Sequence, residues 1–336
     1  MRYLDNDLYL ADVVKTVEQT KDFGYFIGKN ILILGATGLI GSFLTDCLLY
    51  ANQTKKMNLH IYAVSRSMER LRERFGEETG SLCFVEGDVT TLEFDKPFDV
   101  IVHAAGYAYP RAFREKPVET MLANMLGTYR VLETARRNPG CCVLYVSSGE
   151  VQEEVAHLTT RACYPVSKKA GETLCLSYMQ EYQVDVRLAR PCHTFGANVT
   201  GEDNRATAQF IACASDDSDI IMKSEGGQVR SYAYVVDCVS GLLTILARGQ
   251  AGKVYGVSSG ETCSIRQFAG WCAESVQRQV VFQEANEIEQ AEASPIKEQI
   301  IDNTELKLLG WMPCYSIKQG IEHSVNIRKS IIGRQK

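Results

Sequence analysis

The segment YPVSKK, at residues 164–169, places a tyrosine and a lysine at a spacing that suits acid–base chemistry. In a helix, Tyr164 and Lys168 share one face and lie about 6 Å apart along the axis. Pro165 fits only in a first helical turn, so Tyr164 is expected at the mouth of the helix. A phenol has a pKa of about 10, and its anion needs about 4 kcal/mol of stabilisation to serve as a base near pH 7. A lysine roughly 4 to 5 Å away supplies about 3 to 4 kcal/mol of this.

A glycine-rich turn follows the strand-like run NILIL and precedes an apolar helix. Strand, turn and helix in this order suit a dinucleotide diphosphate, because glycines let the backbone approach the phosphates and the helix N-terminus presents N–H groups. The alternative is an ordinary turn between a strand and a helix. The residues expected to contact the dinucleotide here are Gly35, Thr37, Gly38, Leu39, Ile40 and Gly41.

The end of the second strand normally selects between NAD and NADP, and here it carries Ser65 and Arg66. An acidic residue at this place would bind the free 2′-hydroxyl of NAD, whereas a guanidinium suits the 2′-phosphate of NADP. The sequence therefore favours NADP while leaving NAD open, and a solvated surface arginine is the alternative. Asp88, after the third strand, is expected at the adenine edge or as a simple strand terminator.

A serine pair, Ser147 and Ser148, ends the strand before the Tyr164 helix. A hydroxyl there can hold the substrate oxygen that Tyr164 deprotonates. A tyrosine and a lysine four residues apart are common on exposed helix faces. The order of glycine turn, strand-end serine and Tyr/Lys helix nevertheless favours a hydride-transfer site.

Composition excludes several classes of function. The net charge of −5 comes from mixed acidic and basic residues without a polybasic tract, so neither nucleic acid nor an anionic membrane is an expected partner. The amino-terminal residues contain no apolar run, which predicts a cytoplasmic protein without signal peptide or membrane span. The 12 cysteines form no CxxC pair and no zinc-type spacing, which predicts reduced thiols and no metal site.

Short apolar runs alternate with longer amphipathic ones from residue 30 onward. This rhythm predicts an α/β fold with a doubly wound parallel sheet. We expect residues 1–29 to form a helical extension and residues 30–190 to form the dinucleotide-binding domain, which also carries the catalytic residues. Residues 191–336 are expected to form mainly a smaller substrate-binding lobe that is interleaved with that domain.

Motifs spread over residues 30–325 resemble the extended short-chain dehydrogenase/reductase family, the NAD(P)-dependent nucleotide-sugar epimerases and dehydratases. They are GATGLIG, HAAGYAYPRAFREKPVETMLANMLGT, YVSSGEV, YPVSK, RPCHTFG, GQVRSYAYVVD and LGWMP. The resemblance implies a Rossmann-like fold, a bound NAD or NADP and a nucleoside-diphosphate sugar that is oxidised transiently at C4. It also implies a homodimer whose interface includes the Tyr164 helix.

The resemblance also implies roles for individual residues. Tyr164 is similar to the family's base, and Lys168 to its partner, which also binds the nicotinamide ribose. Ser148 resembles the hydroxyl that orients the sugar, Asn124 a residue that supports the nicotinamide site, and Arg230 a ligand of the diphosphate. Further expected cofactor contacts are Val89, Ala104, Ala105, Gly106 and Pro191, and further expected substrate contacts are His193 and Arg205.

The stretch Ser148-Gly149-Glu150 bears on which reaction follows the oxidation. The 4,6-dehydratases and UDP-glucuronate decarboxylases have a glutamate at the place of Glu150, where it suits proton abstraction at C5. Gly149 lacks the acid that dehydratases use at C6, and KEQIIDNT, at residues 297–304, lacks the arginine of the decarboxylases. Dehydratase, decarboxylase and epimerase therefore remain open. An NADPH-dependent keto-sugar reductase and a non-catalytic dinucleotide sensor are the alternatives.

Overall fold

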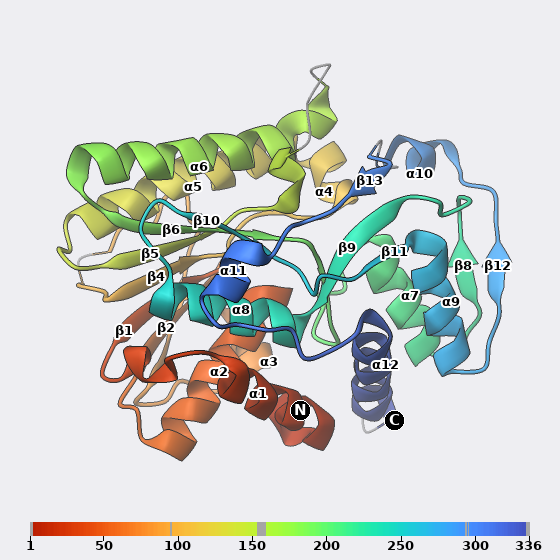
Figure 1. Ribbon diagram of the computed structural model, residues 1–336, viewed down its shortest axis with the longest axis horizontal. Helices are drawn as coiled ribbons and strands as arrows, with labels where there is room; N and C mark the ends of the chain where they lie inside the picture. Colours follow the sequence, from red (N-terminus) through yellow and green to blue (C-terminus); the bar gives the residue numbers. More distant parts are fainter. Residues whose placement is uncertain (1–2, 95, 153–158, 293, 295, 334–336) are drawn as a thin grey trace.

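Seven parallel strands form the central sheet of the computed structural model, which describes residues 3–94, 96–152, 159–292, 294 and 296–333. The strand order is β10-β6-β5-β4-β1-β2-β3 (Figure 1). The strands are β1 (Asn30–Leu34), β2 (His60–Ser65), β3 (Leu82–Glu86), β4 (Val100–His103), β5 (Cys142–Val146), β6 (Asp185–Pro191) and β10 (Val254–Val257). The predicted α/β fold with a doubly wound parallel sheet is confirmed.

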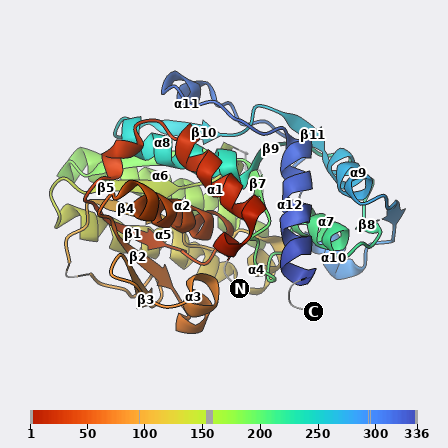
Figure 2. The same cartoon turned by 90° about the horizontal axis from the view of Figure 1, so that it is seen from below.

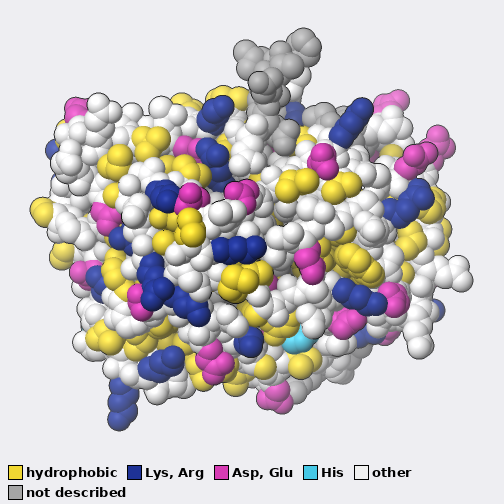
Figure 3. Space-filling view, in the orientation of Figure 1, with side chains coloured by type: hydrophobic (Ala, Val, Ile, Leu, Met, Phe, Trp, Pro, Cys, Tyr) yellow, Lys and Arg dark blue, Asp and Glu magenta, His cyan; other side chains and the backbone are white. Residues whose placement is uncertain are grey.

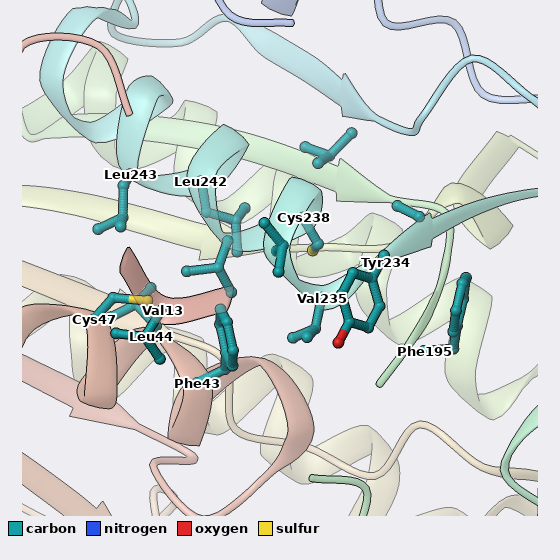
Figure 4. Packing of buried hydrophobic residues seen from close by; sticks show 14 of the residues in the cluster. Val13, Phe43, Leu44, Cys47, Phe195, Tyr234, Val235, Cys238, Leu242 and Leu243 are labelled. Atoms are coloured by element: carbon teal, nitrogen blue, oxygen red, sulfur yellow. The ribbon is translucent and has the colours of Figure 1, made fainter. Parts of the chain in front are cut away.

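The sheet is buried on both faces because alternate residues of its apolar strands point to opposite sides. In β1, Ile31 and Ile33 join one apolar cluster, whereas Leu32 and Leu34 join another. The first cluster packs under the helices α1 (Asp7–Gln19), α2 (Leu39–Lys55) and α8 (Val235–Arg248). Figure 4 shows Val13 of α1, Phe43 of α2 and Leu242 of α8 meeting in this layer.

The opposite face is covered by two long helices, α5 (Pro117–Arg136) and α6 (Cys163–Tyr182), which lie side by side (Figure 1). Tyr145 and Cys175 belong to the apolar cluster between these helices and the sheet. The order in which strands are added reverses between β1 and β4: β2 and β3 lie on one side of β1, whereas β4, β5 and β6 lie on the other. Ligands of open parallel sheets bind at the carboxyl ends of the strands beside such a switch point.

A smaller lobe of mixed strands and helices is built around β9 (Val229–Tyr234). This strand pairs with β11 (Thr262–Ser264), β13 (Glu298–Gln299) and β7 (His193–Phe195), while β8 (Ile220–Met222) pairs with β12 (Val280–Phe282). Its helices are α7 (Ala206–Ser215), α9 (Ile265–Ser275) and α12 (Ile317–Gly333). The shorter helices of the chain are α3 (Met68–Phe75), α4 (Pro110–Glu115), α10 (Glu287–Glu292) and α11 (Thr304–Leu308).

The surface carries charges of both signs, and the cysteines are not paired in disulfides. Lys and Arg side chains alternate with Asp and Glu over the face seen in Figure 3. All 12 cysteines are free thiols. No helix within the described ranges is both long and apolar enough to cross a membrane.

Helix α1 ties the sheet domain to the smaller lobe through one buried carboxylate, that of Asp12, which is 0% exposed. Asp12 accepts hydrogen bonds from the hydroxyls of Tyr234, at 2.5 Å, and Tyr315, at 2.8 Å. The Nδ1 of His323 on α12 lies 3.1 Å from the same carboxylate, which raises the pKa of that histidine. Figure 2 shows α1 and α12 side by side. The amino-terminal segment is thus part of the packed core.

Replacing Asp12 by alanine should lower the free energy of unfolding by about 2 to 4 kcal/mol, because the buried Tyr234 hydroxyl loses its acceptor. Urea denaturation measures this difference. Glu18→Ala, an exposed acidic position on the same helix, should change stability by less than about 0.5 kcal/mol. Equal effects of the two substitutions would contradict the role given to Asp12.

Candidate active site

An open cleft lies at the carboxyl ends of the central strands. Many of the residues that the sequence predicts as site residues line it together. They are Gly35, Gly38, Leu39, Ile40, Gly41, Ala104, Gly106, Ser148, Glu150, Tyr164, Lys168, Pro191, His193 and Arg205. The structure thus brings the glycine turn, the strand-end serine and the Tyr/Lys helix to one place.

The glycine turn forms a tight cradle in which side chains at Gly35 and Gly41 would collide with the backbone. Gly35 has a φ of +83°, and a Cβ there would lie 2.6 Å from the carbonyl oxygen of Ala104. A Cβ on Gly41 would lie 2.2 Å from the carbonyl oxygen of Gly35. Gly38 is the N-cap of α2 and has no capping side chain, so the first N–H groups of the helix face the cleft mouth. The backbone here suits a diphosphate, as the sequence predicts.

Other predicted cofactor contacts lie beside the cleft and do not line it. Thr37 and Ser65 approach each other, with their hydroxyl oxygens 3.2 Å apart. Asp88 accepts from the N–H and the hydroxyl of Thr90, at 2.8 and 2.6 Å, which is the geometry of a turn. Val89 is buried against Gly127 of α5. The remaining residues outside the lining are Arg66, Ala105, Asn124 and Arg230.

Arg66 is exposed but held in place by Tyr107, which the sequence analysis missed. Its guanidinium carbon lies 4.6 Å from the ring centroid of Tyr107, and its Nη1 donates to the Tyr107 hydroxyl. That hydroxyl in turn donates to Glu119, at 3.0 Å. Since Tyr107 lines the cleft, Arg66 stands at its rim.

Asn124 is fully buried and links α5 to the start of α6. Its Nδ2 donates to the hydroxyl of Ser167, at 3.0 Å, and Ser167 donates to the carbonyl oxygen of Tyr164, at 3.2 Å. A Cβ on Gly106 would lie 3.0 Å from the Asn124 Oδ1 atom. Asn124 therefore supports the residues that line the cleft from behind.

Tyr164 is 6% exposed and its ring stacks on Phe113, with centroids 4.7 Å apart. Burial, helped by the nearby charge of Glu150, raises the pKa of Tyr164 to about 12. A hydrogen bond with Ser148 acts in the opposite direction. The protein's own groups therefore raise the pKa of Tyr164, whereas the sequence predicts that Lys168 lowers it.

Lys168 does share the helix face with Tyr164, but its ammonium group is held elsewhere. Its Nζ donates to the carbonyl oxygen of Val146, at 2.8 Å, and lies 5.1 Å from the ring centroid of Tyr145. Burial lowers the pKa of Lys168 to about 8, against the opposing charge of Glu172. The spacing of four residues places Lys168 on the same helix face as Tyr164, but it does not determine where the end of the long lysine side chain points.

Two ion pairs lie at the end of the cleft near Tyr164. Arg161 donates to Glu150, with Nη2 and Oε2 2.8 Å apart, and Arg205 grips Asp203 through Nε, at 3.0 Å from both carboxylate oxygens. Sequence reasoning missed Arg161 and Asp203. Arg161 stands in the short segment before Tyr164, and no motif marks it. Residues 153–158 lie outside the described part of the chain.

Arg230 belongs to β9, is 2% exposed and does not line the cleft. It donates to the carbonyl oxygens of Val229, at 2.9 Å, and Ile296. Burial and the charge of Arg230 lower the pKa of His193 to about 3, so this lining residue is a neutral ring at pH 7. The lining also includes Ser147 of the predicted serine pair, and Tyr109, Thr200 and Gln299, which the sequence did not single out.

The orphaned hydroxyl of Ser147 shows that the cleft is prepared for a polar ligand. It is buried, lines the cleft and has no hydrogen-bond partner within the described ranges. Together with the cradle at Gly35 and Gly41, it fits a dinucleotide. No group of three or more His, Cys, Asp or Glu side chains among the described residues is arranged to hold a metal ion.

Comparisons with known proteins agree with this geometry. The family model described as NAD dependent epimerase/dehydratase family matches residues 31–258. UDP-glucuronic acid decarboxylase 6 of Arabidopsis thaliana is 28% identical over 305 residues, covering 87% of this chain and 86% of that protein. UDP-glucuronic acid decarboxylase 1 of Danio rerio is 29% identical over 311 residues, covering 88% and 72%.

Solved structures share the fold. A dTDP-glucose 4,6-dehydratase from Streptomyces venezuelae with NAD bound has a TM-score of 0.77 at 21% identity, covering 91% of this chain and 98% of that one. A UDP-glucuronic acid 4-epimerase from Bacillus cereus, in complex with UDP-glucuronic acid and NAD, has a TM-score of 0.75 at 19% identity, covering 90% and 99%.

Gly41→Ala should weaken dinucleotide binding at least tenfold and destabilise the fold by about 1 to 3 kcal/mol, because the new methyl group meets backbone and not a mobile side chain. Calorimetric titration and urea denaturation measure the two effects. Gly270→Ala, in helix α9 with nothing within 4 Å of the added Cβ, should instead raise stability by about 0.5 to 1 kcal/mol. Unchanged dinucleotide binding in Gly41→Ala would refute the cradle.

Proposed function

Because the chain belongs to the NAD dependent epimerase/dehydratase family, we propose that it modifies a nucleoside-diphosphate sugar through transient oxidation at C4. The observation that carries this proposal is the convergence of Ser148, Tyr164 and Lys168 on the cleft that also contains the glycine turn. The names of the relatives support a sugar nucleotide as substrate, since they include decarboxylases, a dehydratase and an epimerase of such compounds.

Tyr164 takes the proton of the C4 hydroxyl in this proposal, and Ser148 holds the same oxygen through a hydrogen bond. When bound, the oxidised dinucleotide supplies the hydride acceptor and a positive charge that makes the phenol more acidic. Lys168 contributes its ammonium group to the same cleft, and the Val146 carbonyl fixes its position. The stacking of Phe113 on Tyr164 excludes water from one face of the phenol.

Glu150 lines the cleft close enough to Tyr164 to influence its pKa. A carboxylate at this place can remove a proton from C5 once C4 is a ketone, because the ketone acidifies the neighbouring C–H bond. Arg161 orients this carboxylate. After the oxidation, the sugar can lose water, lose carbon dioxide or invert the configuration of a ring carbon. Return of the hydride to the sugar then ends the cycle.

Replacing Tyr164 by phenylalanine should lower kcat by about 10² to 10⁴, because the step loses its base, while dinucleotide affinity stays within about threefold. Mass spectrometry of products from UDP-, dTDP-, CDP- and GDP-sugars measures turnover. Tyr182→Phe, an exposed position on the same helix, is the matched control and should keep full activity. Undiminished turnover in Tyr164→Phe, or stoichiometric consumption of NADPH by the unaltered enzyme, would contradict the proposed cycle.

Arg66 makes the site accept NADP as well as NAD in this proposal. The solved relatives named above hold NAD. The guanidinium of Arg66 is fixed over Tyr107 at the rim of the cleft, where it can pair with a 2′-phosphate.

Arg66→Ala should therefore weaken NADP binding at least tenfold and leave NAD binding within about threefold. Fluorescence titration with each dinucleotide measures the two affinities. Arg72→Ala, an exposed arginine on α3, should change neither. Parallel losses for NAD and NADP would contradict a role of Arg66 at the phosphate.

An exposed apolar stripe on α5 supports a homodimer. Val118, Leu122, Met125 and Tyr129 recur at helical spacing and are each more than 40% exposed. Helix α6 lies alongside, so a second copy of the chain would complete a four-helix bundle, as the resemblance to the family implies.

The double variant Leu122→Asp, Met125→Asp should shift the protein from dimer to monomer, because it places charges in the apolar interface. Sedimentation analysis measures the change in mass. Leu308→Asp, in the exposed helix α11, should leave the mass unaltered. A monomeric unaltered protein would refute the dimer.

A further inference from the structure

Among the described residues, the carboxylates at the sugar end of the cleft are each paired with an arginine, and from this we propose that the substrate carries an uncharged group at C6. The preferred substrate is then a nucleoside-diphosphate hexose and not a hexuronate. This inference rests on the proposed function and narrows its substrate class.

The first pair is Glu150 with Arg161. Its carboxylate lines the cleft, and the guanidinium lies behind it, 2.8 Å away. The guanidinium carbon of Arg161 lies 4.7 Å from the ring centroid of Phe113, and Phe113 stacks on Tyr164. The side chain of Arg161 is 25% exposed and that of Glu150 is 16% exposed. Arg161 is thus held by a carboxylate and an aromatic face at once, and swinging toward a ligand would break both contacts.

The second pair is Arg205 with Asp203, and its geometry is local. The Asp203 carboxylate is 6% exposed and accepts from the guanidinium and from the backbone N–H of Arg205, at 3.0 Å. Two residues so close in sequence hold each other through a turn and a planar fork. The charge of Arg205 is therefore already compensated when a substrate arrives.

Within the described part of the chain, the cleft lining holds as many acidic as basic side chains. Among the described residues that line the cleft, the acidic ones are Glu150 and Asp203 and the basic ones are Lys168 and Arg205. His193 is a neutral ring at pH 7, since burial first and the charge of Arg230 second lower its pKa to about 3. Lys168 is turned to the carbonyl oxygen of Val146.

A sugar carboxylate would therefore enter beside Glu150 and Asp203, where the described guanidinium groups, those of Arg161 and Arg205, already hold a carboxylate. It would have to break an existing ion pair and leave a second carboxylate buried, which is strongly unfavourable. A hydroxymethyl group meets no such penalty and can donate to a carboxylate oxygen. Specificity here comes from a repulsive element as much as from an attractive one. The inference separates this chain from the substrate that the names of its decarboxylase relatives state.

The test compares sugar nucleotides that differ only at C6, which are UDP-glucose with UDP-glucuronate and dTDP-glucose with dTDP-glucuronate. Dissociation constants are measured by calorimetry on NAD-loaded protein carrying Tyr164→Phe, so that the sugars stay intact. The neutral sugar of at least one pair should bind at least tenfold more tightly, which is about 1.4 kcal/mol. Asp203→Asn and Glu150→Gln should each shift the ratio at least threefold toward the uronate, because each releases an arginine.

Glu202→Gln is the matched control, since it removes the same charge one residue from Asp203. Its carboxylate pairs with Arg70 and does not line the cleft, so the ratio should not move. Tighter binding of either uronate by the protein with intact ion pairs would overturn the inference and leave the proposed function intact. An unchanged ratio in both charge variants would overturn it too. If no sugar nucleotide binds or reacts, the proposed function fails and the inference fails with it.

Discussion

The contact between the Lys168 ammonium group and the Val146 carbonyl oxygen is the constraint on which the site depends. Val146 is the last residue of β5, and Ser147 and Ser148 follow it directly into the cleft. A charge-assisted hydrogen bond of about 1.5 to 3 kcal/mol at this point fixes α6 against the carboxyl end of the strand. The helix can then present Tyr164 only opposite Ser148. The buried link from Asn124 through Ser167 holds the same turn of α6 from the other side.

Burial shifts the pKa values of both Tyr164 and Lys168 in the direction that favours the uncharged side chain. It raises the pKa of Tyr164 to about 12 and lowers that of Lys168 to about 8, so both groups are pushed toward their neutral forms. The protein alone therefore disfavours the phenolate that the chemistry needs. A site of this kind responds strongly to an incoming positive charge, because the same low polarity that penalises an isolated ion strengthens the attraction between two. We therefore expect that binding of a ligand with a cationic ring lowers the pKa of Tyr164.

Local patterns in the sequence were enough to predict the sheet, the glycine turn and the Tyr/Lys helix. Alternating apolar runs specify parallel strands, and φ at Gly35 requires a residue without a side chain. The direction of Lys168 was not predictable, because a spacing of four residues does not say which of two acceptors a flexible side chain reaches. The partners of Glu150 and Arg205 were equally hidden. Arg161 could not be recognised because one of its contacts is with Phe113 of α4, which the fold brings from a distant part of the chain.

The structure adds a second contact to the interpretation of Glu150, namely its ion pair with Arg161. In the sequence it resembles the glutamate of dehydratases and decarboxylases and favours proton abstraction at C5. In the structure the same carboxylate also forms an ion pair with Arg161. In the proposed cycle this one side chain has two roles: it acts on a C–H bond of the substrate, and it keeps the Arg161 cation from binding the sugar. On our proposal, a change of charge pairing around Ser148, Tyr164 and Lys168 would alter which sugar enters this cleft without moving the three residues that we assign to its oxidation.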